Sequence, residues 1–340
     1  MKFALGKEED TVGTLFTGIQ PTGFLHIGNY FGAIKNWVNL QYEYESYISI
    51  VDYHAITILY DIEDMGRNVF EMALGLYACG IDLEKTTLFV QSEVPGHAEL
   101  TWIFNTVTPL GELERMTQFK DKSKHNRANV NIGLLDYPVL QAADILIYKG
   151  EAVPVGEDQV QHIEFAREVA RRFNARYGDT FPECKALLTD TPRVMGLDGL
   201  SKMSKSQGNY IALFEPKEEI WKNVSVAKTD PARKRRTDPG TPEKCNIYSL
   251  HQLVTQEEQL ETIHEGCTTA GIGCLDCKRI FVDNLMIVLN PIQERYRDLC
   301  SRKKEIRGVL DKNAAHCREV AKATILEVKQ KMGLSPVWQI

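Results

Sequence analysis

The sequence predicts an α/β fold, a Rossmann-type doubly wound parallel sheet followed by a smaller C-terminal helical domain. Through about residue 200, short runs of aliphatic and β-branched residues alternate with longer amphipathic stretches, a pattern typical of βαβ units. Beyond that point the strand-like runs stop and helical spacing dominates. We therefore expect a Rossmann domain over residues 1–206 and a helical domain over residues 207–340, whose last helix can pack back on the first domain.

The individual elements follow from periodicity. We expect strands at 14–19, 47–56, 86–94 and 186–190, and a strand-like segment at 152–155. Helical spacing predicts helices at 27–44, 65–80 and 158–173, then at 257–266, 277–300 and 314–333. Pro291 lies inside one of these helices, and we expect it to kink or break that helix.

Composition limits the class of protein. Hydrophobic residues make up 43% of the chain, enough for a full core, and the net charge of −6 argues against indiscriminate nucleic-acid binding. Basic patches at 233–236 and 302–304 still leave room for a structured RNA partner. The first residues lack a signal-peptide core, and no apolar stretch reaches membrane-spanning length. The sequence thus predicts a cytoplasmic protein that does not interact with membranes.

The segment 16–34, FTGIQPTGFLHIGNYFGAI, contains the first candidate site. A strand ends near Gly18, a glycine and proline turn follows, and a helix begins near His26 and Gly28. A helix N-terminus at the carboxyl end of a first strand is where α/β sheets bind phosphate. The segment is neither a Walker A loop nor a G-x-G-x-x-G fingerprint. A glycine-rich turn with a core histidine is the structural alternative.

The second candidate is KMSKS, residues 202–206, which lies among glycines in a segment without an apolar stripe. Two ammonium groups and two hydroxyls on such a loop suit closure over a polyphosphate. A solvated, lysine-rich surface loop is the alternative. The pairing of KMSKS with the upstream HIGN is much more specific than either string alone.

With these two motifs the sequence resembles the class I aminoacyl-tRNA synthetases, and within them the bacterial tryptophanyl-tRNA synthetases, over nearly the whole chain. The resemblance implies activation of L-tryptophan by ATP with Mg²⁺, transfer to tRNA(Trp), and a homodimer. Asn29 stands where the second histidine of the HIGH motif would be, which is usual in this branch. The segments that carry the resemblance are GIQPTGFLHIGNYFGAI, IVDYHAIT, GELERMTQFKDKS, YPVLQAADILIY, VPVGEDQVQHIEFAREVARRFNARYG, KMSKS and NPIQERY.

The resemblance also implies site residues at matching positions. The implied catalytic residues are His26, Asn29, Lys120, Lys202, Ser204 and Lys205. The implied ATP contacts are Gln20, Gly28, Asn29, Gly156, Asp158, Lys202 and Lys205. The implied tryptophan contacts are Phe16, Gly18, His54, Tyr137, Gln141, Asp144, Val155 and Gln159. Gln141 departs from the methionine found in many bacterial members, which makes that side of the pocket more polar.

The segment DYPVLQAADILIY, 136–148, supports tryptophan as the amino acid. We expect Asp136 to cap a helix whose first turn contains Pro138, with Tyr137 and Asp144 on one face. A carboxylate among aliphatic neighbours needs a hydrogen-bond donor, and an indole N–H is a donor without acceptor capacity. A carboxylate tied to a neighbouring helix end is the alternative.

Four of the eight cysteines cluster late in the chain with the spacing C-x21-C-x6-C-x2-C. Four thiolates can hold zinc or an iron–sulfur cluster. A subset of bacterial tryptophanyl-tRNA synthetases carries a [4Fe-4S] cluster with closely similar spacing, and this resemblance favours the cluster over Zn²⁺ or unligated thiols. The expected ligands are Cys245, Cys267, Cys274 and Cys277.

Two other functions remain open at this point. A tyrosine-activating relative on the same fold is compatible with Asp144. An iron–sulfur redox protein on a Rossmann scaffold is a third hypothesis, but both nucleotide motifs are superfluous for electron transfer. ATP–pyrophosphate exchange with each amino acid separates these hypotheses.

Overall fold

The computed structural model describes residues 13–120, 130–188 and 193–334. Its centre is a parallel sheet with the strand order β3-β2-β1-β4-β5. Strand β1 lies in the middle, with β2 and β3 added on one side and β4 and β5 on the other. This order confirms the predicted doubly wound sheet. Within the described ranges, every helix is too short or too polar to cross a bilayer. The strands are β1 (Thr14–Ile19), β2 (Glu45–Ile50), β3 (Thr86–Val90), β4 (Ala152–Val155) and β5 (Lys185–Leu188).

Strand ends are where the sequence prediction differs most from the structure. The first strand has the predicted bounds, but β2 ends at Ile50 and β3 ends at Val90, so both predicted strands were too long. In each case the chain turns at once into a short helix, over Asp52–Ala55 and Gln91–Glu93. The side chain of Asp52 accepts backbone hydrogen bonds from Tyr53 and Ser92, which ties the two turns together. The predicted strand 186–190 extends beyond the described residues.

The predicted helices are present, with several differences in detail. The helix predicted at 27–44 is three successive pieces, with a π-helical turn at Tyr30–Ile34 between two α-helical ones. The helices of the Rossmann part are α1 (Ile27–Asn29), α2 (Lys35–Leu40), α3 (Asp52–Ala55), α4 (Ile62–Ala78), α5 (Gly96–Asn105), α6 (Leu110–Leu113), α8 (Ile132–Leu146) and α9 (Val160–Tyr177). Those that follow are α10 (Lys217–Ser225), α11 (Asn246–His251), α12 (Glu257–Thr268), α13 (Cys274–Ser301) and α14 (Lys303–Lys331).

The prediction allowed a kink or a break at Pro291, and the structure excludes the break, because α13 continues through Pro291 to Ser301. A proline removes the hydrogen bond to the carbonyl four residues earlier, here that of Ile287. Pro291 is exposed and Ile287 is 71% exposed, so this carbonyl lies on the side of the helix that water can reach. The loss of one hydrogen bond is therefore tolerated.

Each face of the sheet has its own core, because successive side chains of a strand point to opposite faces. Ile48 of β2 and Leu88 of β3 belong to one core, whereas Tyr47 and Phe89 belong to the other. The first core is shared with the C-terminal helices, since it also contains Leu289 of α13. The two parts of the chain are thus joined by apolar packing as well as by the backbone.

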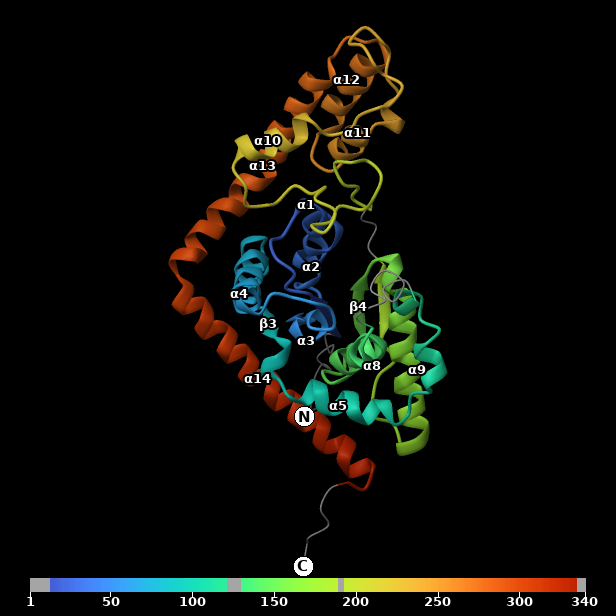
Figure 1. The fold of residues 1–340 in the computed structure, drawn as a ribbon. Helices are drawn as coiled ribbons and strands as arrows, with labels where there is room; N and C mark the ends of the chain where they lie inside the picture. Colours follow the sequence, from blue (N-terminus) through green and yellow to red (C-terminus); the bar gives the residue numbers. More distant parts are fainter. Residues whose placement is uncertain (1–12, 121–129, 189–192, 335–340) are drawn as a thin grey trace, which may run out of the picture.

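The two longest helices run along one side of the molecule (Figure 1). Helix α13 passes from α10, α11 and α12 down to α4, and α14 continues past β3 to α5. Asn313 of α14 donates to the carbonyl of Leu88, and Thr324 donates to the carbonyl of Ile147. The last helix therefore packs against the sheet and its covering helices.

The shared core predicts the stability of two variants on one helix. Leu289→Ala should lower the free energy of unfolding by about 2–5 kcal/mol, because Leu289 is completely buried and its truncation leaves a cavity. Ile287→Ala, on the exposed side, should change it by about 0.5 kcal/mol or less. Urea denaturation followed by circular dichroism measures both values. Equal losses in the two variants would contradict the placement of this helix.

Candidate active site

The two sequence motifs, at 26–29 and 202–206, lie side by side although they are distant in sequence. Residues that follow KMSKS pair with the residues around His26, since Ile27 N donates to Ile211 O at 2.9 Å and Leu213 N donates to Leu25 O at 3.0 Å. Within KMSKS, Met203 is 2% exposed. A Cβ atom at Gly28 would lie 2.8 Å from His26 Nδ1 and 3.2 Å from Met203 Cβ. Glycine is therefore needed at position 28 for the motifs to meet.

The His26 ring is held as a neutral donor. Burial, together with the charges of Lys205 and Lys202, lowers the pKa of His26 from 6.5 to about 4. Its Nδ1 accepts a hydrogen bond from Asn29 N at 3.3 Å, while Asn29 Oδ1 accepts from His26 N at 3.0 Å. A neutral imidazole carries one hydrogen, so it sits on Nε2. His26 thus presents an N–H donor, and Asn29 fixes its orientation.

The KMSKS segment is wrapped around Asn209, a buried residue that the sequence analysis did not select. Asn209 Oδ1 accepts from Ser204 N at 2.8 Å, and its Nδ2 donates to Asp198 Oδ2 at 2.9 Å. Lys205 Nζ donates to Thr22 O at 3.2 Å, and burial lowers the pKa of Lys205 to about 8. Lys202 is exposed. The charges of Lys202 and Lys205 both lower the pKa of His26. Two ammonium groups and the imidazole N–H donor therefore lie in one region.

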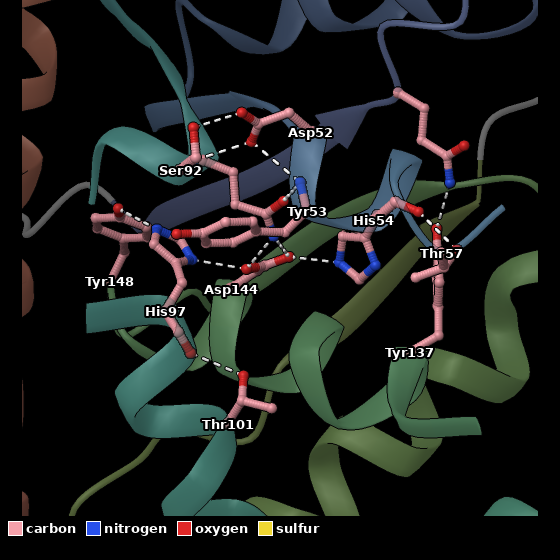
Figure 2. A network of polar contacts seen from close by, with 12 residues as sticks. Asp52, Tyr53, His54, Thr57, Ser92, His97, Thr101, Tyr137, Asp144 and Tyr148 are labelled. Carbon is pink, nitrogen blue, oxygen red and sulfur yellow. Dashed lines mark hydrogen bonds and ion pairs between the residues drawn. The ribbon is translucent and has the colours of Figure 1, made fainter. Parts of the chain in front are cut away.

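A second polar group lies at the carboxyl ends of β2 and β3 and on α8, centred on Asp144 (Figure 2). Asp144 is 1% exposed. Its carboxylate accepts from His54 Nε2 at 2.8 Å, from His97 Nδ1 at 2.6 Å and from Gln91 Nε2, which is 2.8 Å from both oxygens. Burial alone would raise the pKa of Asp144, but the hydrogen bonds from His54 and His97 outweigh it and hold the pKa well below its usual range.

Tyr137 joins the two polar groups. Its hydroxyl accepts a hydrogen bond from Gln20 Nε2 at 3.0 Å, and the centroid of its ring lies 4.0 Å from that of the His54 ring. Phe16 at the centre of β1 is 3% exposed and stacks on Tyr148 at 5.8 Å. His54 thus contacts both Tyr137 and Asp144, and Phe16 reaches this group through Tyr148, beside the segment that contains Gln20.

The helix that carries Asp144 begins earlier than predicted. Asn131, not Asp136, caps α8, with its Oδ1 accepting from Leu134 N at 3.0 Å. Asp136 instead accepts from Asn105 Nδ2 at 3.0 Å, and Pro138 lies inside the helix. Both asparagine and aspartate are good caps, so local preference could not separate the two positions.

A third segment follows β4. A short helical turn at Glu157–Gln159 leads into α9, so the predicted strand-to-helix junction at Gly156 is confirmed. A Cβ at Gly156 would lie 2.9 Å from Asp158 Oδ1, and Gln118 Nε2 donates to Asp158 O at 3.2 Å. The hydrogen bond from Gln118 places the chain just before Lys120 against the junction. Gly18, on β1, cannot carry a side chain because a Cβ there would lie 2.9 Å from Val51.

The comparisons with known proteins agree with this geometry. The family described as "tRNA synthetases class I (W and Y)" matches residues 8–289. The chain belongs to this family. The tryptophan–tRNA ligase of Deinococcus radiodurans is 51% identical over 324 residues, which cover 94% of this chain and 98% of the relative. That of Thermotoga maritima is 45% identical over 94% of this chain and 99% of the relative.

A solved structure of the family is similar over the same span. The tryptophanyl-tRNA synthetase from Campylobacter jejuni, complexed with ADP and tryptophan, has a TM-score of 0.85 at 35% identity. The match covers 94% of this chain and 100% of that one. Family membership favours the synthetase interpretation over the iron–sulfur redox protein.

The synthetase site contains polar residues that sequence reasoning missed, namely Gln91, His97 and Tyr148. His97 lies at the start of α5, just after the turn that ends β3. A histidine at the carboxyl end of a strand is a usable signal, but His97 was assigned to no motif. Gln91 was placed inside a strand that in fact ends one residue before it.

Gln141, a predicted tryptophan contact, is on α8. Its Oε1 is buried and, among the described residues, has no hydrogen-bond partner. It lies one helical turn before Asp144 on α8. This position keeps a free acceptor on the same face as the carboxylate, which agrees with a more polar pocket.

The electrostatics of His26 give a testable pH dependence. The His26 ring should titrate near pH 4 in NMR spectra, and Lys205→Met should raise that pKa because it removes a repelling ammonium. Since the folded pKa lies below 6.5, the free energy of unfolding should fall as the pH decreases from about 6.5 to about 4. Lys222→Met, on exposed α10, is the control and should leave the His26 pKa unchanged. A parent value near 6.5 would contradict a buried, repelled ring.

Proposed function

We propose that the chain activates L-tryptophan with ATP to tryptophanyl-adenylate and transfers it to tRNA(Trp). The observation that carries this proposal is the pairing of the HIGN and KMSKS segments beside a buried carboxylate, in a chain that is 51% identical to a tryptophan–tRNA ligase over 94% of its length. The Campylobacter jejuni structure, complexed with ADP and tryptophan, supports the same pair of substrates.

In the first step, an oxygen of the tryptophan carboxylate attacks the α-phosphorus of ATP and pyrophosphate leaves. No covalent enzyme nucleophile takes part. We assign the Nε2–H of His26 to a phosphate oxygen and the ammonium groups of Lys120, Lys202 and Lys205 to the negative charge that moves onto pyrophosphate. Mg²⁺ enters with ATP as part of that substrate. Binding to phosphate would also raise the lowered pKa of Lys205, which keeps it charged when it is needed.

In the second step, a hydroxyl of the 3′-terminal ribose of the tRNA attacks the acyl carbon and AMP leaves. The remaining predicted contacts complete the ATP site and the amino-acid site. We assign Gln20, Gly28, Asn29, Gly156 and Asp158 to the adenosine, Ser204 to the mobile KMSKS segment, and Gly18, Tyr137, Gln159 and Val155 to the amino acid. The cytoplasm, where tRNA is charged, is part of this proposal.

The amino acid is chosen by the hydrogen-bonding groups around Asp144. A carboxylate has about four lone-pair sites. Three side chains donate to Asp144, and Gln91 shares one N–H between both oxygens. An indole N–H can therefore join as a further donor. Tyrosine on the same fold is the alternative, and tyrosine-dependent pyrophosphate exchange distinguishes it.

The activation step predicts a separation of rate from binding. His26→Ala and Lys202→Ala should each reduce the rate of tryptophan-dependent ATP–pyrophosphate exchange by about 10² or more, because they remove groups that act on the transition state. Tryptophan affinity, measured by fluorescence titration, should change little. Lys35→Ala, an exposed lysine on nearby α2, is the control. Equal losses in rate and tryptophan affinity would count against the assignment.

We further propose that Cys245, Cys267, Cys274 and Cys277 hold a [4Fe-4S] cluster in the part of the chain that meets the tRNA anticodon. Burial, then the charges of the other three thiols, raises the pKa of Cys277 to about 12, so the four groups lie within electrostatic reach of one another. Arg233 Nη1 donates to Cys267 Sγ at 3.7 Å, and the buried Lys278 also lies within electrostatic reach of the thiols. Two buried cations suit a group of four thiolates.

The choice of a cluster over Zn²⁺ rests on the spacing of the four cysteines and on the family resemblance. Tetrahedral zinc with bonds of about 2.3 Å needs thiolates about 3.8 Å apart. Among the described residues, no group of three or more such donors is close enough to hold one metal ion. When bound, the cluster would cross-link the ends of α12 and α13.

The cluster proposal is tested by colour and metal content. Protein purified without oxygen should be brown and contain iron, and Cys274→Ser should lose the colour, because thiolate ligation is required. The same variant should keep pyrophosphate exchange but lose aminoacylation of tRNA, since activation takes place in the Rossmann part. Cys300→Ser, on the same helix, is the matched control. A colourless protein with stoichiometric zinc would overturn the cluster, and full aminoacylation by Cys274→Ser would remove its role with tRNA.

We propose a homodimer, with support from an exposed apolar surface. Tyr53, Ile56 and Leu140 line a cleft of about 370 Å³. Trp102 on α5 and Ile132 at the start of α8 are also unusually exposed for their type, at 74% and 76%. Exposed large apolar side chains, together with this cleft, support a protein–protein contact.

The dimer predicts the behaviour of a charged variant. Trp102→Glu should convert the protein to monomers, because a buried carboxylate at the interface would be unpaired. Ile287→Glu, equally exposed on α13, should leave the dimer intact. Size-exclusion chromatography with light scattering measures the mass. A monomeric parent protein would disprove the proposal.

A further inference from the structure

His97 is a completely buried histidine that the proposed chemistry does not use. It lies at the start of α5, on the side of Asp144 opposite His54, and both of its ring nitrogens have partners (Figure 2). Nδ1 is 2.6 Å from Asp144 Oδ1, and Nε2 is 2.8 Å from the Tyr148 hydroxyl. His54, on the other side of the carboxylate, differs because its Nδ1 has no partner among the described residues.

The direction of these hydrogen bonds follows from the chemistry of the groups. An ionised carboxylate can only accept, so Nδ1 of His97 carries a hydrogen and donates it. Burial strongly raises the pKa of the Tyr148 phenol, which therefore stays protonated and can donate to Nε2. The chain of donors runs from Tyr148 through His97 to Asp144. This arrangement allows one orientation of the ring.

Tyr148 is itself immobilised by its neighbours. Its ring stacks on the rings of Tyr47 and Phe16, with centroids 4.7 Å and 5.8 Å apart, and the interplanar angle to Phe16 is 8°. The Cys317 thiol of α14 lies beside its hydroxyl. Phe16 is one of the residues assigned to the amino-acid pocket. The group that orients His97 therefore also packs against a wall of that pocket.

We propose that His97 is a positioning residue that sets the rotation of the Asp144 carboxylate and so leaves one lone pair directed at the substrate's indole N–H. This inference rests on the proposed function. Without the Nδ1 hydrogen bond, Oδ1 would lose its shortest contact, and the carboxylate could turn about its last bond toward Gln91 and His54. Selectivity for an amino acid with an N–H would then fall.

Two variants of similar size separate positioning from packing. In His97→Asn, the amide nitrogen can take the place of Nδ1 and still donate to Asp144. In His97→Gln, the amide nitrogen reaches the place of Nε2, toward Tyr148, and leaves Asp144 without that donor. Thermal unfolding by circular dichroism establishes that both variants are folded before they are compared.

The readout is selectivity between two isosteric substrates. ATP–pyrophosphate exchange is measured with L-tryptophan and with β-(benzo[b]thiophen-3-yl)-L-alanine, in which sulfur replaces the N–H group. His97→Asn should keep most of the ratio of kcat/KM between the two amino acids. His97→Gln should reduce the ratio by about tenfold or more, through tryptophan alone, because a site that pairs an N–H discriminates by that contact.

The possible outcomes are distinguishable. If both variants lower kcat/KM for the two substrates by the same factor, or leave the ratio of the parent protein unchanged, His97 has only a structural role and the inference is wrong. If the parent protein activates no tryptophan at all, the proposed function fails instead. A parent protein that activates tryptophan and prefers it over the sulfur analogue, with Asn and Gln variants that differ as described, supports both.

Discussion

The burial of one negative charge constrains much of this structure. The Asp144 carboxylate has almost no contact with water, and an unpaired charge in that position would be very costly. The donors that stabilise it come from the ends of three different elements, with His54 on α3, Gln91 in the turn after β3 and His97 on α5. The relative positions of these elements are thereby fixed around α8. The requirement to pair one buried charge therefore constrains the part of the fold where the amino acid is proposed to bind.

The two ends of the proposed site, one for the amino acid and one for the phosphates, are built in different ways. The amino-acid end consists of buried side chains from regular elements, and its ring stacking and hydrogen bonds leave little freedom. The phosphate end depends on backbone pairing between the residues around His26 and the segment after KMSKS, with Asn209 bracing the loop from inside. The first end is thus held by side-chain packing, and the second by backbone pairing between segments that are distant in sequence.

Sequence patterns predicted the sheet, because the alternation of short and long segments is a local signal, and the family resemblance implied that the two motifs share one ATP site. They also placed Asp144 correctly as a buried carboxylate. They did not reveal two of its partners, Gln91 and His97. Gln91 was assigned to a strand because hydrophobic alternation does not show where the hydrogen-bonded ladder ends. His97 was missed because its partners, Asp144 and Tyr148, are distant in sequence.

Two local predictions failed for equally physical reasons. Asp136 and Asn131 have similar capping preference, so the start of α8 depended on which side chain was free to cap, and Asp136 is engaged by Asn105. Pro291 was expected to kink or break a helix, and the break does not occur because the proline lies on the exposed side, where water can reach the unpaired carbonyl. In both cases the deciding neighbour could be identified only in three dimensions.

The packing of α14 has a consequence for the order in which the protein is made. The ring of His316 stacks on Tyr47, and Cys317 lies beside Tyr148, so the support of the amino-acid pocket comes from residues near the end of the chain. Domains generally fold from the N-terminus during synthesis. The sheet and the HIGN segment emerge from the ribosome early, but the ring that backs Phe16 remains uncovered until α14 has been translated. The nascent chain therefore acquires its phosphate-binding end before its amino-acid pocket is complete.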